Sequence, residues 1–172
     1  MINQSINNIE ELLEYLTKDS KGYYIEQPTI YSKENIDGHT IYSRYKYFND
    51  KIDNNLLKRH LQKDINLAIS LENIDAIVYE YCGVNQEAFY FLLKYYYEQK
   101  KFQNIFITAL DNSKMVVYIE VKMKNFDDFN SLVEEIDKNL TKKLDKEWRV
   151  LPDFKAPKIG NLLELPRELI NF

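Results

Sequence analysis

Residues 74–121 constrain the fold of this chain more than any other stretch. They begin with the short run 74–81, whose apolar, β-branched and aromatic residues predict a strand. A helical pattern follows, with Asn85 as its expected N-cap. Two further strands, 105–110 and 115–121, are separated by Asp, Asn and Ser residues that are typical of a tight turn. The stretch therefore predicts a strand and a helix followed by a β-hairpin.

Periodicity assigns the side chains of these elements to faces. Apolar residues recur at helical spacing after the expected cap, at Phe89, Leu92, Leu93 and Tyr96. In the last strand, alternation puts Met115, Val117, Ile119 and Val121 on one face and Val116, Tyr118 and Glu120 on the other.

A second helix and a final strand extend the pattern. Residues 126–144 carry an apolar stripe and follow Asn125, the expected cap. Residues 148–151 suit a short strand before Pro152. The order β-α-β-β-α-β over residues 74–151 predicts an α+β fold with a ferredoxin-like, RRM-like core, in which both helices cover one face of an antiparallel sheet.

The opposite face of that sheet is predicted to carry Phe106, Val116, Tyr118 and Glu120, together with Val78 and Glu80. Because this face is too apolar to stay in water, we expect the N-terminal hairpin and the C-terminal tail to cover part of it. We accordingly expect a single domain, 1–172, made of an N-terminal α+β extension (1–72), the core (73–151) and a docking tail (152–172).

The N-terminal extension is expected to begin with a helix capped by Ser5 or Asn7. Glu10 would complete a capping box with Asn7. Asp53 would cap a second, short helix. Residues 65–71 fit either the end of that helix or a strand.

Between these two helices the sequence predicts one hairpin. Its strands would be 23–31 and 40–48, and the pair Asp37-Gly38 suits the turn between them. Pro28 would confine the first strand to the edge of a sheet, because proline cannot donate a backbone hydrogen bond.

Composition limits the classes of function. The 172 residues carry a formal net charge of −4, which disfavours sequence-independent binding of nucleic acid through Lys and Arg. No apolar run approaches the roughly 20 residues of a membrane helix. The N-terminus is polar and acidic, unlike a signal peptide, and the single cysteine, Cys82, suits a reducing compartment. We therefore expect a cytoplasmic protein with no membrane span.

Several short motifs occur in an order that is characteristic of one protein family. They are His60-Leu61, Leu67-Ala68, Ser70-Leu71, Glu80-Tyr81-Cys82-Gly83, Phe89-Tyr90, Tyr118-Ile119, Lys146-Glu147-Trp148-Arg149 with Pro152, and Asn161 with Leu165-Pro166. In these motifs, which span residues 40–166, the chain resembles a family of uncharacterised epsilon-proteobacterial proteins with a primase-polymerase (prim-pol)-like palm. The block 146–149 is the most specific of them. The resemblance implies the same RRM-like core that periodicity predicts.

The resemblance does not carry over a catalytic site. Active prim-pol domains place two acidic residues two apart on the first core strand and a His on a later strand, and these residues hold divalent metal and a nucleoside triphosphate. Here the acidic positions read Glu80 and Cys82, and the His position reads Val116. Because a site without its carboxylates holds hard cations poorly, we expect no cofactor. Mg²⁺ or Mn²⁺ would be needed only by a nucleotidyl transferase.

Glu80 and Glu120 are the candidate catalytic residues. An unpaired carboxylate in an apolar strand is costly to bury. Glu80 is therefore either a residual metal or partner ligand, or an acid paired with a Lys, an Arg or a Tyr hydroxyl. Glu120 would form a carboxylate pair with Glu80 if it faces the same way; alternatively, it ends its strand in solvent.

Five other residues are candidates for binding. Phe106 and Tyr118 would stack on bases as RRM aromatics do, or they pack against each other across two strands. Lys146, Trp148 and Arg149 would form a patch for phosphate or an acidic partner with Trp as its anchor, or they are a solvated helix end beside a core Trp. The same basic region includes Lys142, Lys143, Lys155 and Lys158.

The histidines and the cysteine give little further signal. His39 and His60 have no Cys or Asp companion at ligand spacing, so the sequence predicts no zinc site. Cys82 is either a nucleophile whose partners gather in space or a small buried residue, and we expect the latter.

Three functions fit these observations. The first is a non-catalytic interaction protein that binds another protein through a degenerate prim-pol-like palm. The second is a nucleotide or single-stranded nucleic-acid binding protein that kept the palm's binding face. The third is a metal-dependent nucleotidyl transferase that uses Glu80 with acids from elsewhere. We favour the first because the acidic and His positions are incomplete and the net charge is negative.

Overall fold

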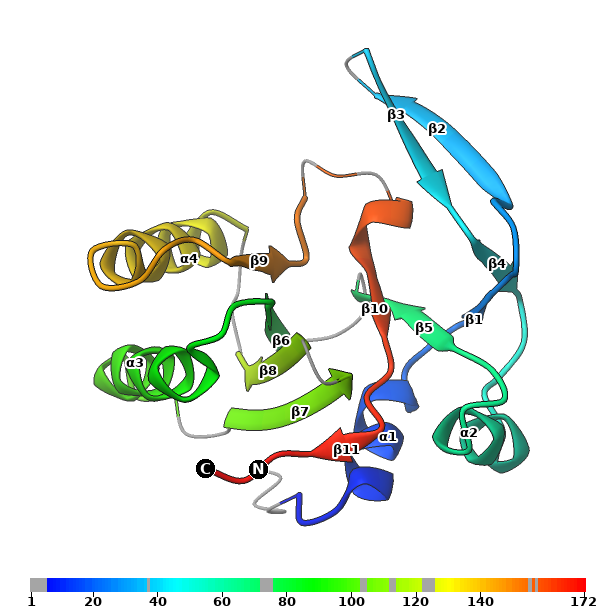
Figure 1. Cartoon of the computed structure of the whole chain (residues 1–172), viewed down its shortest axis with the longest axis horizontal. Helices are drawn as coiled ribbons and strands as arrows, with labels where there is room; N and C mark the ends of the chain where they lie inside the picture. Colours follow the sequence, from blue (N-terminus) through cyan, green and yellow to red (C-terminus); the bar gives the residue numbers. More distant parts are fainter. Residues whose placement is uncertain are drawn as a thin grey trace. The chain divides into compact units, whose positions relative to one another are not determined.

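The computed structural model describes residues 6–36, 38–71, 76–102, 105–111, 114–121, 126–154, 156 and 158–172. These residues form four α-helices and three antiparallel sheets, so the predicted α+β class is confirmed. The chain divides into two compact units (Figure 1). Unit 1 comprises Met1–Ile74 and Pro152–Arg167, and unit 2 comprises Asp75–Leu151 and Glu168–Phe172.

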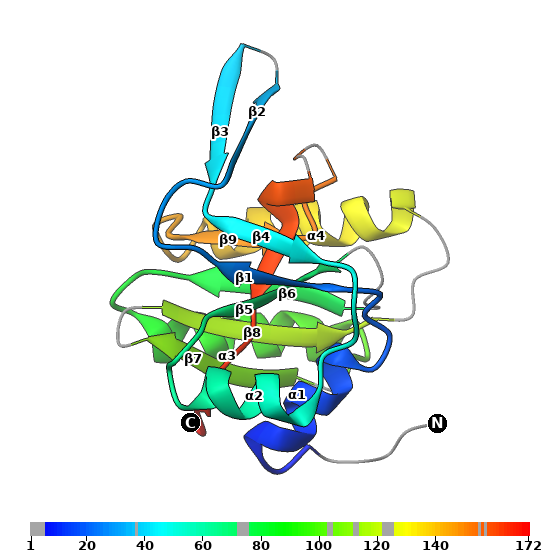
Figure 2. The same ribbon diagram turned by 90° about the vertical axis from the view of Figure 1, so that its right-hand side faces the viewer.

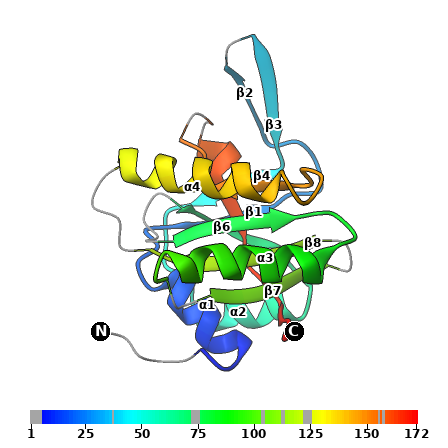
Figure 3. The same cartoon turned by 90° about the vertical axis from the view of Figure 1, so that its left-hand side faces the viewer.

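Unit 2 is a five-stranded sheet with two helices on one face (Figure 3). In chain order its elements are β6 (Ala76–Tyr81), α3 (Gln86–Gln99), β7 (Ile105–Asp111), β8 (Lys114–Glu120), α4 (Phe126–Leu140), β9 (Trp148–Leu151) and β11 (Glu168–Leu169). The strands lie side by side in the order β11-β7-β8-β6-β9, and every neighbouring pair is antiparallel.

The face of this sheet that meets the helices forms the core of unit 2. Its strand pairs are Ile77 with Ile119, Tyr79 with Val117 and Tyr81 with Met115. These side chains pack with Phe89 and Leu93 of α3 and with Ile136 of α4. The predicted alternation of β8 is therefore correct.

The other face of the sheet carries the side chains predicted for it. Tyr118 of β8 pairs with Val78 on one side and with Phe106 on the other, and Val116 pairs with Glu80. Val78, Val116 and Tyr118 are buried. Both faces of the central strands are thus removed from water.

Unit 1 contains a four-stranded sheet and a separate hairpin. Its elements are α1 (Ile9–Thr17), β1 (Tyr23–Glu26), β2 (Ser32–Ile36), β3 (His39–Ser43), β4 (Tyr45–Phe48), α2 (Asn54–Leu61), β5 (Leu67–Ser70), the 3-10 helix η2 (Lys158–Asn161) and β10 (Leu162–Glu164). The sheet has the order β10-β5-β1-β4, while β2 and β3 pair with each other. The β2–β3 hairpin extends away from the four-stranded sheet (Figure 2).

The prediction of two long strands, 23–31 and 40–48, is wrong. The first stretch forms only the short strand β1, and β2 begins after its end, whereas the second stretch divides into β3 and β4. Strand β1 pairs with β4, and β2 pairs with β3. Pro28 lies between β1 and β2, where its missing N–H interrupts the strand. The edge position predicted from Pro28 is also wrong, because β1 lies between β5 and β4. Gly38, with a φ of +80°, lies at the turn of the hairpin.

The caps of the first two helices are close to those predicted. The N-cap of α1 is Asn8, whose side chain accepts a hydrogen bond from the Glu11 N–H at 2.9 Å. The Glu11 carboxylate accepts in turn from the Asn7 N–H at 2.7 Å, so the capping box lies one residue later than predicted. Asp53 caps α2 as predicted, through a 2.8 Å hydrogen bond from the Leu56 N–H.

The two helices of unit 2 differ from prediction at one end each. Asn85 is the N-cap residue of α3, but its side chain makes no capping hydrogen bond. Its backbone N–H donates instead to the Tyr81 hydroxyl at 3.2 Å. Helix α4 ends at Leu140, four residues earlier than predicted, and a turn follows.

Residues 65–71 and the C-terminal tail become strands in the structure. Residues 67–70 form β5, which pairs with β10 in the tail. The tail is therefore not simply an extended docking segment: it contributes a 3-10 helix and β10 to unit 1 and β11 to unit 2. Predictions on Ser5, Asp37, residues 72–75, Asn112, Ser113, Asn125, Lys155 and Pro157 lie outside the described residues.

His60 joins α2 to two other segments of unit 1. Its Nε2–H donates to the Leu165 carbonyl at 2.9 Å, and its Nδ1 accepts from the Leu67 N–H at 3.2 Å. This arrangement requires the neutral ring, because a protonated Nδ1 would face another donor. Burial and the nearby Arg167 guanidinium lower the pKa of His60 to about 4.

We predict that unit 1 loses stability as the pH falls from about 6.5 toward about 4. In this window the unfolded chain protonates His60 and the folded chain does not, so the lost stability approaches about 3 kcal/mol at the acid end. Urea unfolding across this pH range would measure it. His60→Gln should flatten the pH dependence, whereas His39→Gln, at an exposed histidine, should leave it unchanged. Equal slopes in wild type and His60→Gln would contradict the prediction.

Candidate functional site

Glu80 is a buried carboxylate in the middle strand of three, with only 2% of its side chain exposed. Its Oε1 lies 2.9 Å from Lys114 Nζ, at the start of β8. Its Oε2 accepts a hydrogen bond from Arg149 Nε, on the residue directly opposite in β9. Three adjacent strands thus each contribute one charged residue, and we call Glu80, Lys114 and Arg149 the charge triad.

Both oxygens of the Glu80 carboxylate lie beside a cation: Oε2 accepts a hydrogen bond from Arg149, while Oε1 is paired with Lys114 by charge and has no hydrogen bond among the described residues. Lys114 and Arg149 keep 24% and 53% of their side chains exposed, so their cationic groups remain partly hydrated while they neutralise the buried anion. Of the two interpretations of Glu80, this geometry matches the acid paired with Lys and Arg. The three groups together carry one net positive charge.

Glu120 does not form a carboxylate pair with Glu80. It lies opposite Ala76, whereas Glu80 lies opposite Val116. Four residues of strand separate the two positions, or about 13 Å along β8. Of the two alternatives for Glu120, the register excludes the carboxylate pair, because both acids share a face but lie at different ends of the strand pair.

Cys82 is exposed, so the expectation of a buried residue is wrong. It follows the end of β6, and its N–H donates to the Glu147 carbonyl at 2.9 Å, which prolongs the pairing with the β9 side of the sheet. Phe106 and Tyr118 lie directly opposite each other on β7 and β8. This register matches the interpretation of a cross-strand packing pair.

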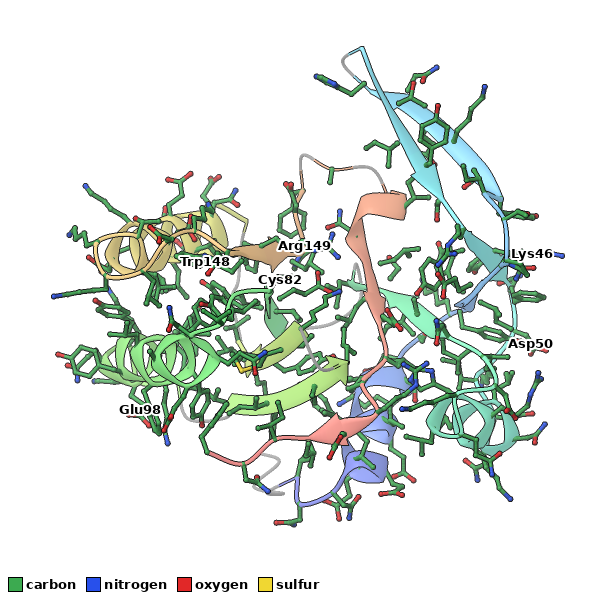
Figure 4. The ribbon with its side chains drawn as sticks, viewed as in Figure 1. Lys46, Asp50, Cys82, Glu98, Trp148 and Arg149 are labelled. Carbon is green, nitrogen blue, oxygen red and sulfur yellow. The ribbon has the colours of Figure 1, made fainter. Side chains whose placement is uncertain are left out.

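The block 146–149 connects β9 with α4 and with β6. Asp137 of α4 accepts hydrogen bonds from Trp148 Nε1 at 2.5 Å and from Lys146 Nζ at 2.6 Å. Trp148 is buried against Phe89, with 5.3 Å between ring centroids. Arg149 points to the other face of the sheet (Figure 4). The most specific motif of the sequence therefore has contacts within unit 2 for its Lys, Trp and Arg.

Two further lysines of the basic region lie in solvent just after the end of α4. Lys142 and Lys143 are exposed, and Lys142 Nζ donates to Asn139 Oδ1 at 3.1 Å. Among the described residues, no three His, Cys, Asp or Glu side chains are grouped so that they could hold a metal ion.

Unit 1 contains an open polar pocket of about 240 Å³ that the sequence did not indicate. It is lined by Glu26, Gln27, Pro28, Arg44, Lys63, Asp64, Ile65 and Asn66. Glu26 pairs with Arg44 and accepts from the Asn66 amide, so two of the four charged side chains that line the pocket are paired with each other. No local motif marks it because three separate segments form its wall.

A family model described as "Domain of unknown function (DUF1882)" matches residues 11–80. The match runs from α1 into β6, so it includes most of unit 1 and the strand that carries Glu80. Lys114 and Arg149 lie outside it. A search of curated proteins gave no match. In the part of the chain that the structure describes, none of the helices has the length and apolarity needed to cross a membrane.

We predict that Glu80→Gln destabilises unit 2 by about 1–3 kcal/mol, because the amide cannot neutralise Lys114 and Arg149. Thermal unfolding followed by circular dichroism would measure the change. The matched control is Glu120→Gln on the same sheet face, which should change stability by less than about 0.5 kcal/mol. Equal effects of the two substitutions would contradict a special role for the triad.

We also predict that Asp137→Ala lowers stability by about 1–3 kcal/mol, because the buried Trp148 N–H then has no acceptor. Asp137→Asn should cost less, since its amide oxygen still accepts from the indole. Trp148 is the only tryptophan, so its fluorescence reports the unfolding of unit 2 directly. If Asp137→Ala leaves both the midpoint and the emission maximum unchanged, the role assigned to Asp137 is wrong.

Proposed function

We propose that the protein is a non-catalytic, cytoplasmic interaction module built on a ferredoxin-like, prim-pol-like core. One observation carries the proposal. The carboxylate that a prim-pol palm would present to metal is buried between Lys114 and Arg149, with both oxygens engaged. An acid used in this way stabilises the sheet and is not available as a metal ligand.

The strand order of unit 2 supports the proposed core. Four neighbouring strands of the sheet lie in the order β9-β6-β8-β7. If the strands of the βαββαβ pattern are numbered along the chain, this order is 4-1-3-2. A split βαβ arrangement places the first and third strands at the centre and both helices on one face. Strand β11 adds a short edge beside β7.

The surroundings of Glu80 support a non-catalytic role. Metal-assisted phosphoryl transfer needs several carboxylates around one or two ions. Cys82 stands where the second acid of the first strand would be, and the buried Val116 lies opposite Glu80. Glu120 is too far along β8 to supply the missing carboxylate.

A second candidate, the binding of a nucleotide or single-stranded nucleic acid, rests on the net positive charge of the triad. Arg149 is half exposed and would offer its remaining donors to a phosphate. A nucleotidyl transferase would need further acids, and it is the least supported function.

The test is a thermal-shift titration of the full chain with Mg²⁺ or Mn²⁺ and nucleoside triphosphates. We expect no saturable rise in the melting temperature at millimolar ligand, because Glu80 is already neutralised. A rise that needs the metal and is lost in Glu80→Gln, measured against that variant's own baseline, would overturn the proposal and support transferase chemistry. A metal-independent rise that weakens with salt and is lost in Arg149→Gln would support the second candidate instead.

A further inference from the structure

Helix α3 has a second apolar stripe that faces away from the core. Phe89, Leu93 and Tyr97 are buried against the sheet. On the opposite side Ala88, Phe91 and Tyr95 are exposed, and so is Val84, two residues before the helix begins; the exposed fractions of Val84, Phe91 and Tyr95 are 93%, 47% and 56%. We call these four residues the outer stripe.

The neighbouring helix α4 shows which residue types occupy exposed positions of a helix on this sheet. Helices α3 and α4 cover the same face of the sheet (Figure 3) and are linked by a 2.8 Å ion pair between Lys100 and Glu135. Among the side chains of α4 that the structure describes, the exposed ones are all polar: Asp127, Asp128, Ser131, Glu134, Glu135 and Lys138. Since the two helices have equivalent places in unit 2, the outer stripe of α3 is not explained by the fold, and such clusters mark interaction surfaces.

The spacing of the outer stripe identifies a helix as its partner. Within α3 the intervals between Ala88, Phe91 and Tyr95 are three and four residues, which is the spacing of the seam of a two-helix coiled coil. Val84 lies four residues before Ala88, just ahead of the helix. The smaller side chains of the stripe, Val84 and Ala88, come first in the chain, and the larger ones, Phe91 and Tyr95, follow. If a second α3 runs antiparallel to the first, Phe91 meets Ala88 of the other copy and Tyr95 meets Val84, so each aromatic ring faces a smaller residue.

In the same antiparallel alignment, charged residues beside the outer stripe would pair with residues of opposite charge on the other copy. Glu87 and Lys94 are seven residues apart and therefore flank the same side of the stripe. In the antiparallel pair Glu87 of each copy lies beside Lys94 of the other, which gives two opposite-charge pairs related by the twofold axis. Among the described residues Lys94 pairs with Glu98 at 3.9 Å and lies over the Tyr90 ring at 5.9 Å, both at the surface.

We propose that the outer stripe is a homodimerisation surface, on which α3 of one copy packs antiparallel against α3 of a second copy. This inference names a partner for the interaction role proposed above and rests on it. The partner is a second copy because, when α3 pairs antiparallel with itself, larger side chains meet smaller ones and acidic side chains meet basic ones.

The test is sedimentation velocity of the full chain from about 1 to about 100 µM, a range that covers micromolar dimers. We expect concentration-dependent dimers in wild type.

Phe91→Ser removes an aromatic ring near the twofold axis from both copies at once, so it should weaken association at least about a hundredfold. Glu87→Lys should weaken it roughly tenfold, because both attractive pairs become repulsive. The double variant Glu87→Lys/Lys94→Glu should restore it, and Glu134→Lys on α4 is the matched control. Circular dichroism confirms that each variant is folded.

A wild-type monomer over the whole range would overturn the inference, and so would a dimer that Phe91→Ser and the charge reversals leave unchanged. These outcomes differ from failure of the proposed function. A nucleotide-dependent thermal shift that needs the metal and is lost in Glu80→Gln refutes the non-catalytic role whatever the oligomeric state, while a monomer refutes self-association and leaves the thermal titration unaffected.

Discussion

Neutralisation of one buried carboxylate is the constraint around which unit 2 is organised. Glu80 lies in β6 between two strands, and an unpaired charge at this place would cost several kcal/mol. Lys114 and Arg149 remove that cost only when β8 and β9 hold their observed registers. A slip of one residue would turn either cation to the opposite face. The triad therefore specifies how three strands align as well as stabilising them.

The two faces of β9 connect this charge to the apolar core. Trp148 packs among the aromatic side chains beneath the helices and donates to Asp137, while its neighbour Arg149 reaches Glu80 on the other face. One short strand thus anchors α4 and completes the triad. This double role explains why the block 146–149 is the most specific motif in the chain without requiring a ligand for any of its residues.

The features with the strongest bearing on function belong to separate parts of the molecule. The matched domain of unknown function, residues 11–80, lies mostly in unit 1, which also holds the polar pocket. The charge triad and the outer stripe of α3 lie in unit 2. Helix α3 differs from α4 in being apolar on two sides, and only one of those sides is used by the core. The proposed interaction role is based on this unused side.

The sequence by itself determined the elements with short-range signals. The order of strands and helices from 76 to 151, the alternation along β8 and the Asp53 cap all depend on spacing within one element, so periodicity and capping chemistry were sufficient. Tertiary structure decided which segments pair. It placed β1 beside β4, turned the tail into strands, and brought to Glu80 an arginine 69 residues away. Local patterns do not encode such contacts, because the free energy that selects them comes from burial and charge neutralisation between distant segments.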